Sequence, residues 1–168
     1  TSLTSVVFKG KTSIGKQAFV GCVNITSVTM ENVEAIGTSA FAGCSSLKAI
    51  TIPSNVTEIP ERAFSGCSSL ETSSFAEGTA LQTIGAYAFR GAAIRELTLP
   101  ESLTVIDYQA FAECKQLQSL HLRGNNPRIG QYVFQNCTSL EKVIIENCGL
   151  YANVFEGCNA ITSIEFYN

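Results

Sequence analysis

Apolar side chains return along this 168-residue chain at a nearly constant interval. Seven phenylalanines mark it, with steps of 22, 23, 25, 22, 23 and 21 residues. The residues are Phe19, Phe41, Phe64, Phe89, Phe111, Phe134 and Phe155. A fixed period of about 20–50 residues is typical of stacked-repeat proteins, so the pattern predicts a solenoid.

Each phenylalanine belongs to a longer apolar motif. Ile or Leu stands five residues before it, and Ala or Val one residue before it. Cys follows three residues later in six of the seven repeats, and the fourth repeat has Ala92 instead. These cysteines are Cys22, Cys44, Cys67, Cys114, Cys137 and Cys158.

A segment with alternating apolar residues follows each of these motifs, as Ile50 and Ile52 illustrate. A period of two predicts a half-buried strand. Eight such segments start near Val6, Val28, Ile50, Ser73, Leu97, Leu120, Val143 and Ile164. One strand per coil, at about 4.8 Å per strand, predicts a parallel sheet roughly 35–40 Å long.

The Ala-Phe-x-Gly-Cys portion is too short for a full helix, so we expect a single helical or 3₁₀ turn there. Glycines on both sides of it, such as Gly37 and Gly43, suit tight backbone turns. One coil cannot bury its apolar face, whereas stacked coils share a continuous core. The predicted fold is an α/β solenoid that is mostly β, with about eight short strands on its concave side and these turns on its convex side.

The motif resembles the BspA-like class of leucine-rich repeats. The clearest copy is L-K-A-I-T-I-P-S-N-V-T-E-I-P-E-R-A-F-S-G-C-S-S, residues 47–69. The resemblance covers the whole chain and implies one leucine-rich-repeat domain over residues 1–168, with about seven to eight coils of 21–25 residues. Proteins of this class are largely secreted or surface proteins of bacteria and anaerobic protists. The resemblance therefore implies an extracellular or cell-surface module for adhesion or ligand capture.

The amino-acid composition limits the classes of partner that this chain could bind. Eleven Lys and Arg residues stand against 14 Asp and Glu, so we expect no nucleic-acid binding through a basic patch. No apolar run approaches the roughly 18–20 residues that span a membrane, and no signal peptide is recognisable. Neither end shows the polar capping unit that solenoids need, so we expect a fragment of a longer protein. Exposed coil ends would allow end-to-end self-association through unpaired strand edges.

The seven cysteines do not indicate a metal site or a disulfide framework. Six share one register and should form a buried column, where Cys behaves as a small hydrophobe. Neighbouring coils would bring such residues within disulfide range, so oxidation of a pair stays open. A linear column does not give a zinc tetrahedron, and His121 is the single histidine. We expect no cofactor. Cys148 lies off register, and the sequence leaves open whether it is exposed or fills the shortened seventh turn.

The outward strand positions should form three columns on the concave face. In the first four coils these columns carry mainly Ser, Thr and Ala, whereas the last four carry charged and apolar groups that suit directional contacts. The predicted ligand-binding residues are Glu96, Thr98, His121, Arg123, Lys142, Ile144 and Glu146. The alternative is a solvated sheet face whose charges are incidental.

The fourth repeat departs from the pattern. Ser73 replaces an inward aliphatic residue, and Phe75 to Ile84 is two residues longer than in repeats three, five and six. The segment from Phe89 to Ile94 is one residue shorter than elsewhere. Drift with a local bend is the favoured interpretation, and a contact made by residues 76–80 is the functional alternative.

The chain shows no nucleophile–base pair or carboxylate pair that would form a closed catalytic pocket, so we expect it not to be an enzyme. The leading hypothesis is recognition of a host or extracellular protein or glycan through the concave face. The alternative is a non-binding structural spacer that displays other domains. Three N-x-Ser/Thr sequons, at Asn24, Asn55 and Asn136, leave glycosylation open.

Overall fold

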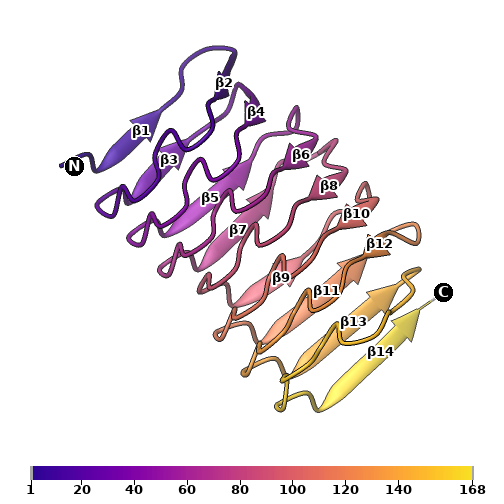
Figure 1. The fold of residues 1–168 in the computed structure, drawn as a ribbon. Coiled ribbons are helices and arrows are strands. Elements are labelled where there is room, and N and C mark those ends of the chain that lie inside the picture. Colours follow the sequence, from indigo (N-terminus) through magenta and orange to yellow (C-terminus); the bar gives the residue numbers. More distant parts are fainter. Residues whose placement is uncertain (1, 168) are drawn as a thin grey trace.

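The computed structural model describes residues 2–167, which form a regular stack of coils (Figure 1). All eight expected strands are present, one per coil, and lie side by side. They are β1 (Ser5–Val7), β3 (Ser27–Thr29), β5 (Ala49–Ile52), β7 (Thr72–Phe75), β9 (Glu96–Thr98), β11 (Ser119–Arg123), β13 (Lys142–Glu146) and β14 (Ser163–Tyr167). We call their outward surface, predicted to be concave, the long-strand face.

Pairing among the long strands is parallel, as expected, but the ladder is not continuous. It divides into β1-β3, β5-β7 and β9-β11-β13-β14. Within each group the predicted columns are confirmed, for example by the alignment of His121 with Thr98 and Ile144. No ladder pair joins β3 to β5 or β7 to β9, so a single uninterrupted sheet was the wrong expectation.

One backbone hydrogen bond shows the interruptions directly. The residue before each long strand donates its N–H to the equivalent carbonyl of the preceding coil, and five of these seven bonds measure 2.8–2.9 Å. The other two stretch to 3.4 Å: Lys48 to Thr26 at the β3/β5 junction, and Arg95 to Glu71 at the β7/β9 junction. The coils therefore separate slightly on this side at two places.

A second parallel sheet, which the sequence did not reveal, lies at the far end of each coil (Figure 1). Its strands form two groups, β2-β4 and β6-β8-β10-β12. They are β2 (Thr12–Ile14), β4 (Val33–Ile36), β6 (Glu58–Ile59), β8 (Thr83–Ile84), β10 (Val105–Ile106) and β12 (Arg128–Ile129). Since β8 pairs with β10, this sheet spans the β7/β9 junction, whereas at the β3/β5 junction both sheets are interrupted.

The seven phenylalanines stack along the axis of the solenoid. Neighbouring ring centroids lie 5.1–5.6 Å apart, with interplanar angles of 2–17°. The five inner rings are completely buried, while Phe19 and Phe155 at the ends are half-buried. Around them, one continuous apolar cluster extends from Ile14 to Cys158. The core is thus shared by all coils, as the repeat predicted.

The turns that carry the phenylalanines are not helical, which corrects the expectation of a helical or 3₁₀ turn on the convex side. Residues 2–167 contain no helix, and the structure accordingly shows no helix in this range that could cross a membrane. The residues two positions before and two positions after each phenylalanine have a positive φ. The later position is glycine in five coils, and it is Glu113 and Asn136 in the other two. A left-handed residue every four positions interrupts any right-handed helix.

The first of these left-handed positions has no glycine signature. Its occupants are Gln17, Ser39, Arg62, Tyr87, Gln109, Tyr132 and Asn153, with φ between 50° and 66°. Five of them, from Gln17 to Gln109, donate the backbone N–H to a carbonyl of the next coil at 2.9–3.2 Å. The strained conformation is therefore offset by hydrogen bonds between coils.

The column of cysteines is buried, and each inner thiol has a specific partner. Cys44, Cys67, Cys114, Cys137 and Cys158 donate to the carbonyl oxygen of the phenylalanine one coil earlier, over 3.0–3.4 Å. All seven cysteines are free thiols. The column acts as a ladder of weak donors as well as a packed apolar strip, which the composition did not indicate.

Candidate functional site

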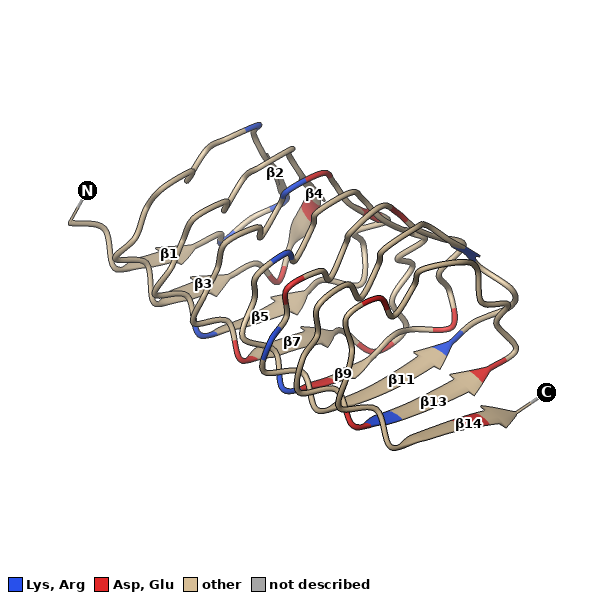
Figure 2. Cartoon of the chain, turned by 60° about the horizontal axis from the view of Figure 1, so that its bottom comes forward, with Lys and Arg blue, Asp and Glu red and all other residues tan. Residues whose placement is uncertain are grey.

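Charged residues on the long-strand face gather in its C-terminal half, on β11, β13 and β14 (Figure 2). The strand registers explain this grouping. Arg123 aligns with Glu146 and Glu146 with Tyr167, one strand apart at each step. Lys142 aligns with Ser119 and Ser163. The parallel ladder thus converts one sequence position per coil into a row of neighbouring side chains.

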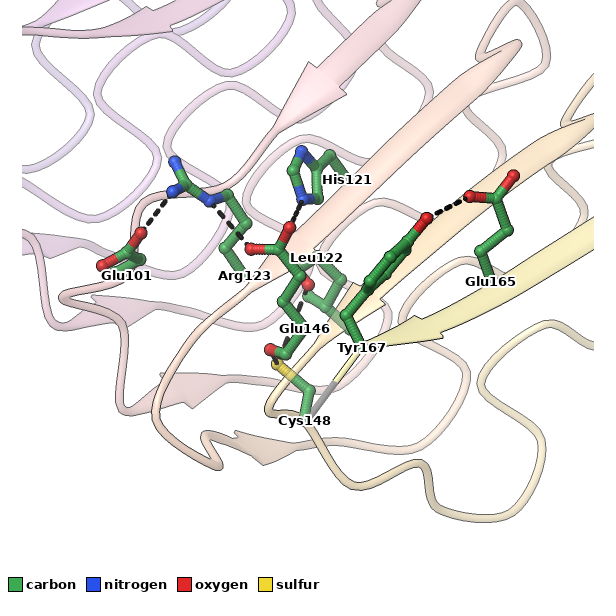
Figure 3. A network of polar contacts seen from close by, with 8 residues as sticks. All are labelled: Glu101, His121, Leu122, Arg123, Glu146, Cys148, Glu165 and Tyr167. Atoms are coloured by element: carbon green, nitrogen blue, oxygen red, sulfur yellow. Dashed lines mark hydrogen bonds and ion pairs between the residues drawn. The ribbon is translucent and has the colours of Figure 1, made fainter.

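Three of the predicted residues form one polar network (Figure 3). Glu146 lies between His121 and Arg123: its Oε1 is 2.9 Å from His121 Nε2, and its Oε2 is 3.3 Å from Arg123 Nε. The other end of the Arg123 guanidinium contacts Glu101. Arg123 therefore sits between two carboxylates, and its charge is already compensated within the protein.

The network shifts the titration of its central carboxylate. The close contact with His121, and after it the hydrogen bond with Arg123, holds the pKa of Glu146 below its ordinary value of 4.5. Cys148 lies beside it, half-buried, with its thiol 3.0 Å from the Glu146 carbonyl oxygen. Burial first, and then the Glu146 charge, raises the pKa of this thiol. The off-register cysteine is thus neither fully exposed nor part of the buried column.

The remaining predicted residues on β13 lie outside this network. Lys142 Nζ is 3.8 Å from Glu165 on β14, whose carboxylate also accepts a hydrogen bond from the Tyr167 hydroxyl at 2.8 Å. Ile144 is half-buried and aligns with His121 on one side and Glu165 on the other. The face therefore places an apolar side chain between polar groups on adjacent strands.

Glu96 and Thr98 lie at a different feature, a cleft at the interrupted β7/β9 junction. Both are exposed, and they line a cleft of about 450 Å³ together with Arg123. The rest of its lining is Ser73, Ser74, Phe75, Ala76, Thr79, Leu99 and Pro100. Glu96 makes no ion pair with any residue in the range 2–167. The site residues thus divide between a charged network and a cleft, and Arg123 belongs to both.

A larger cleft of about 550 Å³ occupies the other interruption, between β3 and β5. It lies in the half of the face that the sequence suggested was featureless. Its lining is mainly small hydroxyl and apolar residues with one charge of each sign, Glu31 and Lys48. We place the candidate site at the smaller cleft, because charged groups from two strands converge there.

Sequence reasoning missed Glu101, which completes the network around Arg123. It lies three residues after the end of β9, beyond the three strand columns, so the period-two pattern gave no signal for it. Residues 76–80, considered as a protruding contact, contribute Ala76 and Thr79 to the wall of the cleft.

Catalytic and metal chemistry find little support in this arrangement. His121 Nε2 faces a carboxylate rather than a Ser, Thr or Cys nucleophile. Within residues 2–167, no three His, Cys, Asp or Glu side chains are grouped closely enough to hold a metal ion. What the site offers is a set of hydrogen-bond donors and acceptors on a rigid sheet.

Comparison with known proteins agrees with this architecture. The family model described as a BspA type leucine rich repeat region matches residues 1–92 and 75–168, with six copies of the repeat. No curated protein matches the chain in sequence.

Among solved structures, a leucine-rich repeat protein from Bacteroides ovatus ATCC 8483 is 26% identical, with a TM-score of 0.65 over 96% of this chain. The chain spans 57% of the length of that protein. A T. pallidum leucine-rich repeat protein is also 26% identical, with a TM-score of 0.76 over 94% of this chain and 77% of its own. The repeat motif, the stacked parallel strands and these matches agree, and the chain belongs to the BspA-type leucine-rich-repeat family.

Proposed function

We propose that this chain is a recognition module of the cell surface or extracellular space, which binds a protein or glycan through the C-terminal half of its long-strand face. Membership of the BspA-type family supports the proposal, because leucine-rich repeats generally serve as interaction or structural modules. A surface location is part of the same proposal and rests on the same family membership.

The observation that carries the proposal is the convergence at the β7/β9 junction. A cleft of about 450 Å³ there adjoins a row of polar residues held by three consecutive strands of one ladder, β9, β11 and β13. Regular backbone pairing fixes the spacing of these side chains, so their ordering costs little entropy on binding. Proteins recognise ligands mainly with such preorganised polar groups beside an apolar surface.

The charge of this surface favours particular partners. This surface carries four carboxylates, from Glu96, Glu101, Glu146 and Glu165, and two permanent cations, Arg123 and Lys142. The surface is therefore acidic on balance. A partner with exposed cationic groups or sugar hydroxyls complements it better than an anionic partner does.

The spacer function is the second candidate, and one observation favours it. Arg123 and Lys142 are each already paired with a carboxylate of this chain, so neither needs a partner to satisfy its charge. A spacer would present such a self-satisfied surface to solvent.

A binding screen separates the two functions. The wild-type chain and an Arg123→Ala, Lys142→Ala double variant are tested against extracellular-matrix proteins and a glycan array. A matched control is Arg128→Ala, since Arg128 is an exposed arginine on β12 in the second sheet. Recognition through this face predicts a binding partner whose affinity changes by at least about tenfold in the double variant, because two side chains and the charge of the surface are altered, and is unchanged in Arg128→Ala.

Two outcomes would count against the proposal. Absence of any partner for the wild-type chain favours the spacer. A partner that binds both variants as well as the wild type places recognition elsewhere on the solenoid.

A further inference from the structure

Ser73 belongs to the lining of the cleft at the β7/β9 junction. This residue occupies an inward strand position that aligns with Ile50, where the other coils carry an aliphatic side chain. Its side chain is 9% exposed, and its hydroxyl is buried without a hydrogen-bond partner. A buried hydroxyl without a partner lowers the stability of the fold. Residues that lower stability in this way are expected at functional sites.

The lining of the cleft combines the groups that bind a sugar ring. Ser74, Thr79 and Thr98 supply hydroxyl groups. That of Ser74 already bonds Thr51 Oγ1 over 3.0 Å, and that of Thr79 accepts from the Leu81 N–H over 3.3 Å, so each keeps only part of its hydrogen-bonding capacity for a ligand. Phe75 and Pro100 add apolar surface, against which the C–H face of a pyranose can pack.

The charged groups that line the cleft determine which ligand charge is favoured. Arg123 is engaged by Glu101 and Glu146, whereas Glu96 has no ion-pair partner within the described residues. The carboxylate left available at the cleft therefore accepts hydrogen bonds from hydroxyl or ammonium groups. A ligand carboxylate would meet Glu96 and one arginine whose charge is already paired.

We propose that the β7/β9 cleft binds a single hexose ring, with preference for an amino sugar over a neutral sugar and rejection of a uronic acid. This inference rests on the proposed recognition function and narrows its ligand to a glycan residue. Glu96 accepts from the ring substituents, the serine and threonine hydroxyls contact the ring hydroxyls, and Phe75 supports the apolar face.

Glucosamine, glucose and glucuronic acid test this proposal, because they share the same pyranose ring and are respectively cationic, neutral and anionic. Each is titrated into the ¹⁵N-labelled chain while amide shifts are followed by NMR. We expect amide shifts to change at residues 73–79 and 96–100. The affinity fitted from these changes should be highest for glucosamine and lower for glucose, and glucuronic acid should cause no change. Absence of shifts there with both glucose and glucosamine overturns the proposal, as does tightest binding by glucuronic acid. The natural ligand could be a free sugar or one residue of a glycan chain, and a glucosamine tetramer distinguishes the two. Tighter binding of the tetramer than of the monosaccharide indicates a glycan chain, and equal binding indicates a free sugar.

Two variants connect the binding to the cleft. Glu96→Gln should abolish the preference for glucosamine over glucose, lowering glucosamine affinity roughly tenfold or more, because a charge-assisted hydrogen bond is lost. The matched control is Glu58→Gln, an exposed glutamate on β6 in the second sheet, which should leave the preference intact. A preference that survives in Glu96→Gln contradicts the assignment.

Ser73→Val replaces the orphaned hydroxyl with two methyl groups in the lining of the cleft. We expect a higher unfolding midpoint together with at least a tenfold loss of glucosamine affinity. Wild-type affinity in a stabilised Ser73→Val chain would make Ser73 a drifted core residue and would overturn the proposal. The broader recognition function is tested separately from the sugar site. It stands if a protein partner binds through Arg123 and Lys142, even when no sugar binds the cleft.

Discussion

The thiol of Cys67 donates a hydrogen bond to the carbonyl oxygen of Phe41, one coil earlier, over 3.2 Å. Both residues are completely buried. The same contact recurs wherever the motif has its cysteine on an inner coil, so it belongs to the repeat rather than to a single site. Ala92 in the fourth repeat shows that the coil can close without it.

Replacing Cys67 with Ala should lower the free energy of unfolding by about 1 kcal/mol, because the Phe41 carbonyl loses the weaker of its two donors and a small cavity forms. Denaturant unfolding followed by circular dichroism measures this. Cys22→Ala is the control, since Cys22 is half-buried in the first coil and should change stability by less than about 0.5 kcal/mol. Equal losses in the two variants would contradict a specific role for the inner thiols.

The buried thiols should also make the protein sensitive to alkali. Burial raises the pKa of Cys44 to about 11 and of Cys67 and Cys114 to about 12, from an ordinary value of 9.0. A raised pKa means that the unfolded chain releases these protons first, so their stabilising effect is complete below pH 9 and falls as the pH rises towards 12. Unfolding midpoints measured from pH 8 to 11 should decline, and the decline should be shallower in a Cys44→Ala, Cys67→Ala, Cys114→Ala variant. A decline of the same steepness in both would assign it to other groups.

Glu146 should titrate at lower pH than an isolated glutamate. Its pKa is held below 4.5 by His121 first and Arg123 second. The stabilisation is therefore present above pH 4.5 and disappears as the pH falls through the lowered value. Carboxyl ¹³C NMR measures the midpoint directly. In His121→Ala it should move up towards 4.5, whereas Lys142→Ala, whose partner is Glu165, should leave it unchanged.

The phenylalanine stack should be most sensitive at its centre. Phe64 is fully buried between Phe41 and Phe89, with centroids 5.5 and 5.3 Å away. Phe64→Ala should lower the free energy of unfolding by about 3–5 kcal/mol. Phe155→Ala, which removes a half-buried ring at the end of the stack, should cost clearly less. Similar losses at both positions, measured by denaturant unfolding, would argue against a stack whose contribution depends on burial.

Where the sequence predicted the fold correctly, the signal was local and periodic. Ile50 and Ile52 alternate around an outward Thr51, and β5 forms there with that alternation of burial. The second sheet was missed because its strands contain only two to four residues. Glu58–Ile59, for example, is too short to show any period. The convex turns were misjudged because residues such as Arg62 adopt a positive φ without being glycine or asparagine.

The candidate site was predictable to the same extent. Arg123 and Glu146 occupy the same register position, so stacking the coils predicted their proximity, and the structure confirms it. Glu101 comes from a loop, whose path depends on tertiary contacts rather than on the repeat. The clefts arise from spacing between coils, visible only as a bond that lengthens from about 2.9 to 3.4 Å, and no single-chain pattern encodes such a change.

The two interruptions in the ladder of long strands also determine how the molecule should respond to a pull along its length. At the β7/β9 junction, β8 and β10 still share a ladder, so load passes through the opposite sheet. At the β3/β5 junction neither sheet is continuous, and load falls on the turn hydrogen bonds, such as those of Phe41 to Ala63 and Gly43 to Ser65, and on the stacked rings. Tension applied to the two ends would therefore rupture the solenoid first between β3 and β5. The first four strands of the chain, β1 to β4, would peel away as one piece, while the C-terminal coils that carry the candidate site keep their shape.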